Sequence, residues 1–142
     1  MTTVHIKWYG AYDFNSFSER EIASQRGIYA FYRVFGGNET LFYIGKTERS
    51  FKQRFKEHQK EWLWNVRGQL KVRIGILEFP EGSKYSAQKL DHVESLLIVW
   101  HKPTINTTSS KYYNKRYKLD VISTGRRGSV DKFISAENLE WE

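Results

Sequence analysis

Two runs of β-branched and aromatic residues, one on each side of a glycine pair, constrain the fold of this chain most strongly. The runs are GIYAFYRV (27–34) and LFYI (41–44), and both compositions are typical of strands. Gly36 and Gly37, followed by an asparagine, supply the backbone freedom that a tight turn requires. The sequence therefore predicts that the two runs pair as a β-hairpin.

A helix, a third strand and a second helix are predicted after the hairpin. Residues 50–66 favour a helix that Ser50 caps, with one apolar stripe made of Phe51, Phe55, Trp62 and Val66. LKVRIGILEF (70–79) favours a strand that ends before a proline. Residues 84–101 favour a helix whose inward side chains are Leu90, Val93, Leu97 and Trp100. The order β-β-α-β-α predicts an α+β fold, in which helices flank a small antiparallel three-stranded sheet.

The chain of 142 residues has no linker-like tract and is expected to form one domain. A motif core of about 27–110 lies between two flanking segments, 1–26 and 111–142. In the first flank, VHIKWYGAYDF favours either a strand or an extended aromatic arm. In the second, residues 117–123 favour a strand and residues 130–139 a short helix.

The composition restricts the compartment and the class of partner. The chain carries 23 lysines and arginines against 16 acids, and its net charge of +7 favours nucleic acid or an anionic membrane surface as a partner. It has no apolar run of membrane-spanning length and no secretory signal, so a cytoplasmic protein without a membrane segment is expected. The absence of cysteine excludes disulfide bonds and thiolate zinc sites.

Arg54 and His58 are candidates for the wall of a cleft. They are four residues apart in the predicted helix, so they share a face, and that face borders the apolar stripe at Phe51 and Phe55. Such a position is neither freely solvated nor fully buried. The alternative is an ordinary surface pair that happens to fall on one side of the helix.

Glu94 is a candidate metal ligand, because the spacing directs its carboxylate inward between Leu90 and Leu97. A buried glutamate must be paired, protonated or bound to a metal, and Mg²⁺ prefers such oxygen ligands. The alternative is a structural ion pair with an arginine.

Tyr29 and Tyr43 lie on the two strands of the predicted hairpin, where they could share a face. Tyrosines in strands usually serve packing, so neither is informative alone. Gly45 follows the second tyrosine, and its missing Cβ would permit the close approach of a ligand. Lys46 could then place an ammonium group near a phosphate or beside a phenol.

Together these residues resemble the GIY-YIG nuclease superfamily. GIY stands at 27–29 and YIG at 43–45, and five further residues agree in order with the family's pattern: Lys46, Arg54, His58, Glu94 and Asn106. The resemblance covers residues 27 to about 110. Thirteen residues separate the two tripeptides, slightly more than is usual, and the excess falls in the turn at 36–40.

The resemblance implies a DNA endonuclease that depends on a divalent metal, Mg²⁺ or Mn²⁺. It makes Tyr29 the general base on water, with His58 relaying or positioning its proton, and Tyr43 orienting water or phosphate. Glu94 would bind the metal, whose Lewis acidity stabilises the leaving oxygen. Gly27 and Gly45 would be structural glycines of the motif.

Three further roles follow from the same resemblance. Arg54 would hold the non-bridging phosphate oxygens in a bidentate manner, which lysine does less well. Lys46 and the metal would lower the pKa of the tyrosine base, because a nearby positive charge favours the phenolate. Asn106 would shape the site through hydrogen bonds.

The basic residues predict how DNA, expected to be double-stranded, is held. Lys46, Lys52 and Arg54 belong to the basic run 46–60, and KYYNKRYK (111–118) interleaves tyrosines with four cations, Lys111, Lys115, Arg116 and Lys118. A homodimer or a partner subunit could add to this grip. The alternatives are a solvated connector at 111–118, an inactive nucleic-acid-binding module on the same fold, or a structural domain with basic surfaces.

Overall fold

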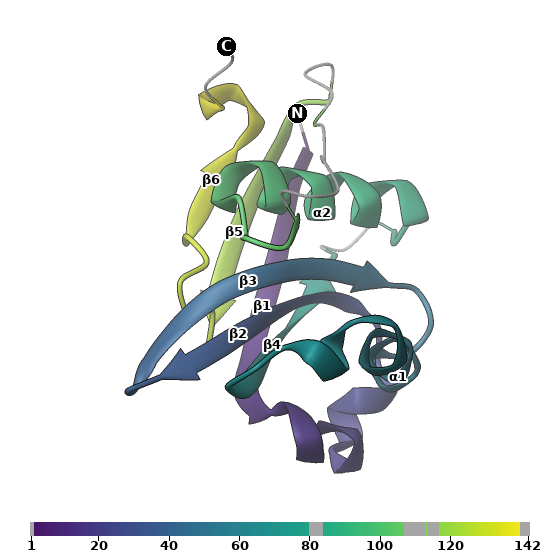
Figure 1. The fold of residues 1–142 in the computed structure, drawn as a ribbon. Helices are drawn as coiled ribbons and strands as arrows, with labels where there is room; N and C mark the ends of the chain where they lie inside the picture. The colour runs from purple at the N-terminus through teal and green to yellow at the C-terminus, as the bar shows by residue number, and fades with distance from the viewer. Residues whose placement is uncertain (1, 80–83, 107–112, 114–116, 140–142) are drawn as a thin grey trace.

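The computed structural model describes residues 2–79, 84–106, 113 and 117–139, which form a six-stranded curled sheet with helices on both faces (Figure 1). The strand order is β3-β2-β4-β1-β5-β6. The strands are β1 (Thr2–Asp13), β2 (Gly27–Phe35), β3 (Asn38–Thr47), β4 (Gln69–Glu78), β5 (Leu119–Gly125) and β6 (Phe133–Ser135). The sheet is mixed, because β1 pairs with β5 in parallel and the other neighbours are antiparallel.

The expectation of a small antiparallel three-stranded sheet is therefore wrong. The three predicted strands are present as β2, β3 and β4, but they make only one half of the sheet. The segments treated as flanks supply the other half. β1 lies between β4 and β5 and is not an arm, because its alternate side chains Val4, Ile6 and Trp8 are buried. The short helix expected over 130–139 is also wrong, since this stretch contains β6 and a 3-10 turn, Ala136–Asn138.

Two α-helices are described, α1 (Phe51–Glu61) and α2 (Ala87–His101). Ser50 caps α1 in a reciprocal capping box: its Oγ accepts a hydrogen bond from the Gln53 backbone N–H at 3.1 Å, and the Gln53 side chain accepts one from the Ser50 N–H at 3.3 Å. α1 ends at Glu61, earlier than the predicted 66, and a 3-10 turn (Leu63–Asn65) follows. Short 3-10 turns also fill 14–19 and 21–24.

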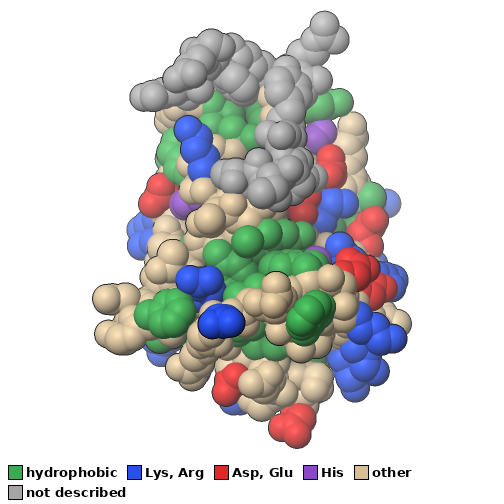
Figure 2. Space-filling model, viewed as in Figure 1, with side chains coloured by type: hydrophobic (Ala, Val, Ile, Leu, Met, Phe, Trp, Pro, Cys, Tyr) green, Lys and Arg blue, Asp and Glu red, His purple; other side chains and the backbone are tan. Residues whose placement is uncertain are grey.

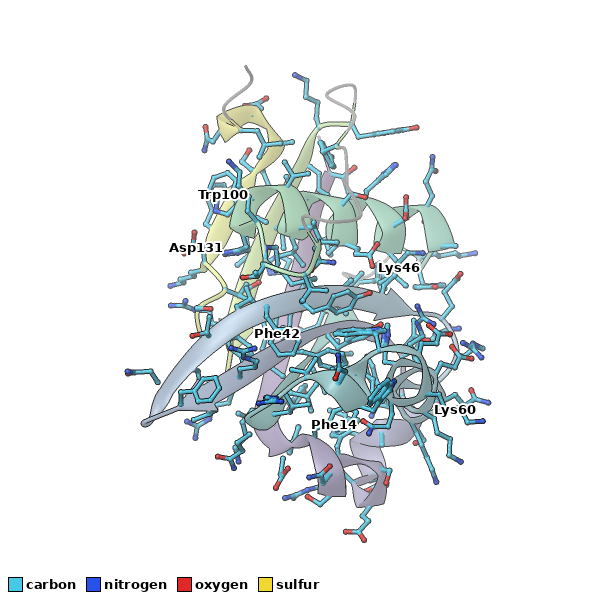
Figure 3. All side chains as sticks on the ribbon, viewed as in Figure 1. Phe14, Phe42, Lys46, Lys60, Trp100 and Asp131 are labelled. Carbon is cyan, nitrogen blue, oxygen red and sulfur yellow. The ribbon has the colours of Figure 1, made fainter. Side chains whose placement is uncertain are left out.

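The strands separate two hydrophobic cores, one on each face of the sheet. Ile28, Ala30 and Tyr32 of β2 belong to the core that α2 covers. Tyr29 and Phe31 belong to the core that α1 covers. Because successive side chains of a strand point to opposite faces, the residues of GIYAFYRV contribute to both cores. Trp100 of α2 donates a hydrogen bond to Asp131 at 2.9 Å, which ties this helix to the segment before β6 (Figure 3).

The predicted hairpin is confirmed, and a bulge adjusts its register. β2 and β3 pair from Gly27 opposite Thr47 to Phe35 opposite Asn38. The register shifts where Phe31 pairs with Tyr43 and the next residue pairs with Leu41, so Phe42 is the extra residue. Among the described helices, none is both long and apolar enough to cross a membrane.

Replacing Trp8 by alanine tests the placement of β1 inside the sheet. Trp8 is 1% exposed and donates a hydrogen bond to Ser123 at 3.0 Å. We expect the variant to lose about 3 to 5 kcal/mol of unfolding free energy in urea, as for a core tryptophan. Lys7→Ala on the same strand is the control, because Lys7 is exposed and should cost less than about 0.5 kcal/mol. Equal small effects in both variants would contradict a buried β1.

Candidate active site

The two tyrosines of the tripeptides lie on the same face of the hairpin, over the core that α1 covers. Their ring centroids are 6.3 Å apart and the rings are stacked at 29°. Tyr29 is fully buried, and Tyr43 is partly buried beside it. The expectation that the tyrosines share a face is thus confirmed.

Gly45 is required by the ring of Tyr29, its partner across the two strands. A Cβ on Gly45 would lie 2.5 Å from both Cζ and the hydroxyl oxygen of Tyr29, so the ring occupies the space of the missing side chain. The expectation that this glycine makes room for a ligand is therefore corrected. Gly27 has a structural role of its own, because its φ is +148° and a Cβ there would lie 2.5 Å from the Gly75 carbonyl oxygen.

His58 is buried between Tyr29 and Trp62, with 2% of its surface exposed. The sequence placed this residue at a partly exposed cleft wall, and its burial corrects that expectation. The hydroxyl of Tyr29 lies 2.6 Å from Nε2 of His58. On the other side of the ring, the indole N–H of Trp62 donates to Nδ1 at 2.8 Å.

The bond from Trp62 determines the tautomer of His58. An indole N–H can only donate, so Nδ1 of the imidazole must accept. A neutral imidazole then carries its single proton on Nε2, and that N–H donates to the oxygen of Tyr29. His58 therefore donates a hydrogen bond to the phenol oxygen of Tyr29, and the hydroxyl proton of Tyr29 points away from His58. This geometry favours a positioning role for His58 over a proton relay.

Burial is the largest cause of the pKa shifts of His58 and Tyr29. Burial, and then the positive charge of Arg54, lower the pKa of His58 to about 4, which keeps the ring neutral at physiological pH. Burial and the neighbouring Tyr43 raise the pKa of Tyr29 far above its usual value, and Arg54 opposes them by charge and hydrogen bonding. Arg54, rather than Lys46, is thus the cation that acts most on the phenol of Tyr29.

Arg54 stands between the tyrosines and an acidic partner on its own helix. Its Nη1 lies 2.8 Å from Oε1 of Glu57, and Nη2 of Arg49 lies 2.6 Å from the same oxygen. The two guanidinium groups lower the pKa of Glu57 to about 2, chiefly through these hydrogen bonds. Glu57 holds Arg54 beside the site, partly exposed and able to face an incoming anion.

Glu94 is a buried acidic residue of α2. The residue is 6% exposed and stands between the buried Leu90 and Leu97, so its predicted inward direction is confirmed. Burial and the charge of Glu94 raise the pKa of Tyr43, and Glu94 also contributes to the raised pKa of Tyr29. The carboxylate is therefore close enough to act on both phenols.

Lys46 and Asn106 connect the end of β3 to α2 and to the loop beyond it. Nζ of Lys46, at the end of β3, lies 3.7 Å from the Asp91 carboxylate on α2 (Figure 3). The side-chain amide of Asn106 pairs with the backbone of Ile44: the Ile44 N–H donates to Oδ1 at 2.7 Å, and Nδ2 donates to the Ile44 carbonyl at 3.0 Å. Asn106 thus holds β3 between Tyr43 and Gly45.

The residues expected to grip DNA are described only in part. Lys52, on α1, and Lys118 are exposed, whereas Lys111, Lys115 and Arg116 lie outside the described residues. Within 111–118, Tyr113 is buried and donates a hydrogen bond to the Tyr117 carbonyl at 2.7 Å, so this tyrosine packs on the domain.

The face that carries β3 and α1 presents both apolar and charged surface. Figure 2 shows hydrophobic side chains in a band across its middle and charged side chains of both signs at its right-hand side, over α1. In the described part of the chain, no three His, Cys, Asp or Glu side chains group as a potential metal site. Glu94 and Asp91, one turn apart on α2, carry carboxylate oxygens, the ligand type that a hard cation prefers.

Sequence reasoning missed three residues of the site. Trp62 was assigned to the apolar stripe, but the helix ends before it and its indole turns to His58. Glu57 lies three residues after Arg54, a spacing that could have indicated the ion pair. Asp91 precedes Glu94 by three residues, which could have indicated a second carboxylate on the same face of α2.

Comparisons with known proteins add no further information about this site. No family model, no curated protein and no solved structure matches the chain.

The lowered pKa of His58 predicts how stability changes in acid. The unfolded chain binds a proton on this histidine below pH 6.5, but the folded protein does so only near pH 4. The unfolding free energy should therefore fall by about 3 kcal/mol as the pH is lowered through this window. Urea unfolding at each pH measures the change, and an NMR titration of the imidazole gives the pKa directly.

His58→Gln is the control for this prediction. Glutamine cannot titrate, so the difference in unfolding free energy between the two proteins should narrow as the pH falls from 6.5 to 4. Parallel curves over this range would mean that His58 titrates normally in the folded protein.

The contact between Gly45 and Tyr29 can be tested with a double-mutant cycle. Gly45→Ala should reduce the unfolding free energy by about 1 to 3 kcal/mol, because the added methyl group overlaps the tyrosine ring. In a Tyr29→Ala background the same change should cost much less, since the ring is gone. Urea unfolding of the four proteins measures the coupling. Additive effects would show that the glycine is needed for its backbone alone.

Proposed function

We propose that this protein is a metal-dependent endonuclease that hydrolyses phosphodiester bonds of DNA, in the manner of the GIY-YIG nucleases that its motifs resemble. One observation carries the proposal: Tyr29 is hydrogen-bonded to His58 and stacks beside Tyr43, and Arg54 and Glu94 both affect the pKa of these phenols. A phenol, an imidazole, a guanidinium and a carboxylate in one place offer a proton acceptor, a phosphate clamp and a metal ligand. The net charge of +7 favours a polyanionic substrate.

Arg54 is the group best placed to bind the scissile phosphate. Its guanidinium is partly exposed, is held by Glu57 and acts on both tyrosines. A planar guanidinium pairs with two phosphate oxygens at once, and in a partly dry site it stabilises the negative charge that builds up in the transition state.

Tyr29 is the proposed proton acceptor, although burial raises its pKa in the protein alone. The donor bond from Nε2 of His58 stabilises the phenolate oxygen, and Arg54 favours the same ionised form. Tyr43 lies beside it and orients water or phosphate. Deprotonation of Tyr29 thus requires positive charge in addition to that of Arg54.

The proposed cofactor is a hard divalent cation. Glu94 would hold Mg²⁺ or Mn²⁺, because such ions are commonly bound by one or two carboxylates, with water and substrate phosphates completing the coordination. A bound cation would supply Lewis acidity to the phosphate and would lower the pKa of the nearby phenols. The alternative, an inactive nucleic-acid-binding module, would bind DNA and leave it intact.

Cleavage of supercoiled plasmid with and without Mg²⁺ tests the proposal, and Glu94→Gln tests the metal ligand. The amide keeps the shape of the side chain and removes its charge, so nicking should fall at least 100-fold while DNA binding is retained. The control is Lys60→Ala, an exposed residue at the end of α1 (Figure 3), which should cut normally.

Three results would count against the proposal. Binding without any nicking by the wild-type protein would favour the inactive module. Near-normal cutting by Glu94→Gln would remove Glu94 from the metal site. Equal cutting with Mg²⁺ and with a chelator would remove the metal from the reaction.

A further inference from the structure

A cavity separate from the tyrosines is lined by residues near the start of β2 and just beyond the end of β3. Figure 1 shows that β2 begins and β3 ends at the same end of the sheet. Its volume is about 450 Å³, within the range of small-molecule sites. Gly27, Arg49 and Leu90 are among the residues that line it, so it lies between the start of the hairpin, the turn before α1 and the first turn of α2. Neither Tyr29 nor Glu94 lines it, so the site described above does not account for it.

Aromatic rings and cations alternate around this cavity. Tyr85 and Phe79 form one wall, with ring centroids 6.0 Å apart and planes at 84°. The guanidinium of Arg26 lies 4.5 Å from the Tyr85 ring centroid. Behind the lining residues, the ammonium of Lys89 lies 5.7 Å from the Phe79 ring centroid. The hydroxyl of Tyr85 donates to Glu48 at 2.7 Å, which fixes the orientation of the ring. This alternation suits a ligand with both a flat ring and a negative charge.

Arg49 links the cavity to the proposed catalytic groups. It lines the cavity, and its guanidinium shares one carboxylate oxygen of Glu57 with Arg54. Arg54 acts directly on Tyr29. A DNA strand with a phosphate on Arg54 would therefore pass Arg49 next and bring a neighbouring nucleotide to the cavity.

We propose that this cavity is a subsite for the nucleotide that lies next to the scissile phosphate on the DNA strand. This proposal rests on the nuclease function proposed above. The base stacks on the aromatic wall that includes Tyr85, whose ring Arg26 lies over, and Arg49 with Arg26 holds the phosphate. Unpaired nucleotides fit this chemistry best, because a base inside a duplex cannot offer its face to a ring. The subsite thus gives the protein a preference for DNA with an unpaired nucleotide beside the cut.

Binding of a fluorescein-labelled six-nucleotide oligothymidylate, followed by anisotropy in the presence of a chelator, tests the subsite. Tyr85→Leu and Arg26→Gln should each weaken binding about 10-fold, the range expected for loss of one stacked base. Arg33→Gln is the matched control, because Arg33 also stacks on an aromatic ring, Phe35, at 5.0 Å, but at the other end of β2. It removes the same charge and should weaken binding less than 2-fold.

The same oligonucleotide in an NMR titration locates the site. Backbone amide shifts should change at Arg26, Gly27, Arg49 and Ile76. Folding of each variant is checked by its own amide spectrum, and Arg26→Gln alters an exposed side chain, so it remains informative if Tyr85→Leu does not fold. Shift changes confined to other surfaces, equal weakening by Arg33→Gln, or no binding by the wild-type protein would each overturn the subsite.

The subsite and the nuclease can fail separately. If the wild-type protein binds the oligonucleotide through the cavity but does not nick plasmid with Mg²⁺, the subsite stands and the proposed reaction does not. If plasmid is nicked and the variants of Arg26 and Tyr85 bind normally, the reaction stands and the subsite does not.

Discussion

The packing of the Tyr29 ring on the bare backbone of Gly45 is the contact on which the rest of the site depends. The ring lies where a cross-strand side chain would otherwise stand, which directs the hydroxyl to His58. Phe51 and Phe55 of α1 pack edge-on against the same ring, with centroids 6.2 and 4.9 Å away. The position of the Tyr29 ring therefore determines where α1 packs, and α1 carries Arg54 and His58. Tyr43 stands two residues before Gly45 in β3, so regular alternation places it on the same face, and the bulge at Phe42 comes only after this stretch, toward the turn.

The site is assembled around β3, the first strand in the order of the described sheet. The two helices belong to different cores, α1 with Tyr29 and α2 with Ile28 and Ile44. Glu94 of α2 and Arg54 of α1 nevertheless both affect the pKa of Tyr43, which lies on β3 at the edge of the described sheet. Asn106 holds that strand through both polar groups of Ile44, so the loop after α2 determines where the second tyrosine lies.

Features that depend on local pattern could be predicted from the sequence, and features that depend on distant partners could not. Glycine turn chemistry predicted the hairpin, helical spacing predicted the burial of Glu94, and Ser50 marked the start of α1. The opening segment was compatible with a strand or an extended arm, and nothing in it indicated which strands would lie beside it, so the sheet was predicted at half its size. The hydrogen bond from Trp62 to His58 was not predicted, because it depends on the residue at which α1 ends. Periodicity does not determine the end of a helix to better than a few residues.

The parallel pairing of β1 with β5 also affects how the chain reaches this fold. Thr2 pairs with Leu119 and Trp8 with Gly125, so the contacts that complete the middle of the sheet join the most distant parts of the described chain. Closing so long a loop costs conformational entropy before the packing contacts that offset this cost can form. A high contact order therefore slows folding. During synthesis β1 can pair with β4 as soon as the hairpin and β4 exist, but its other edge stays open until residue 125 has left the ribosome. That interval exposes an unpaired apolar strand edge, so folding yield should depend on how quickly the later half of the chain follows.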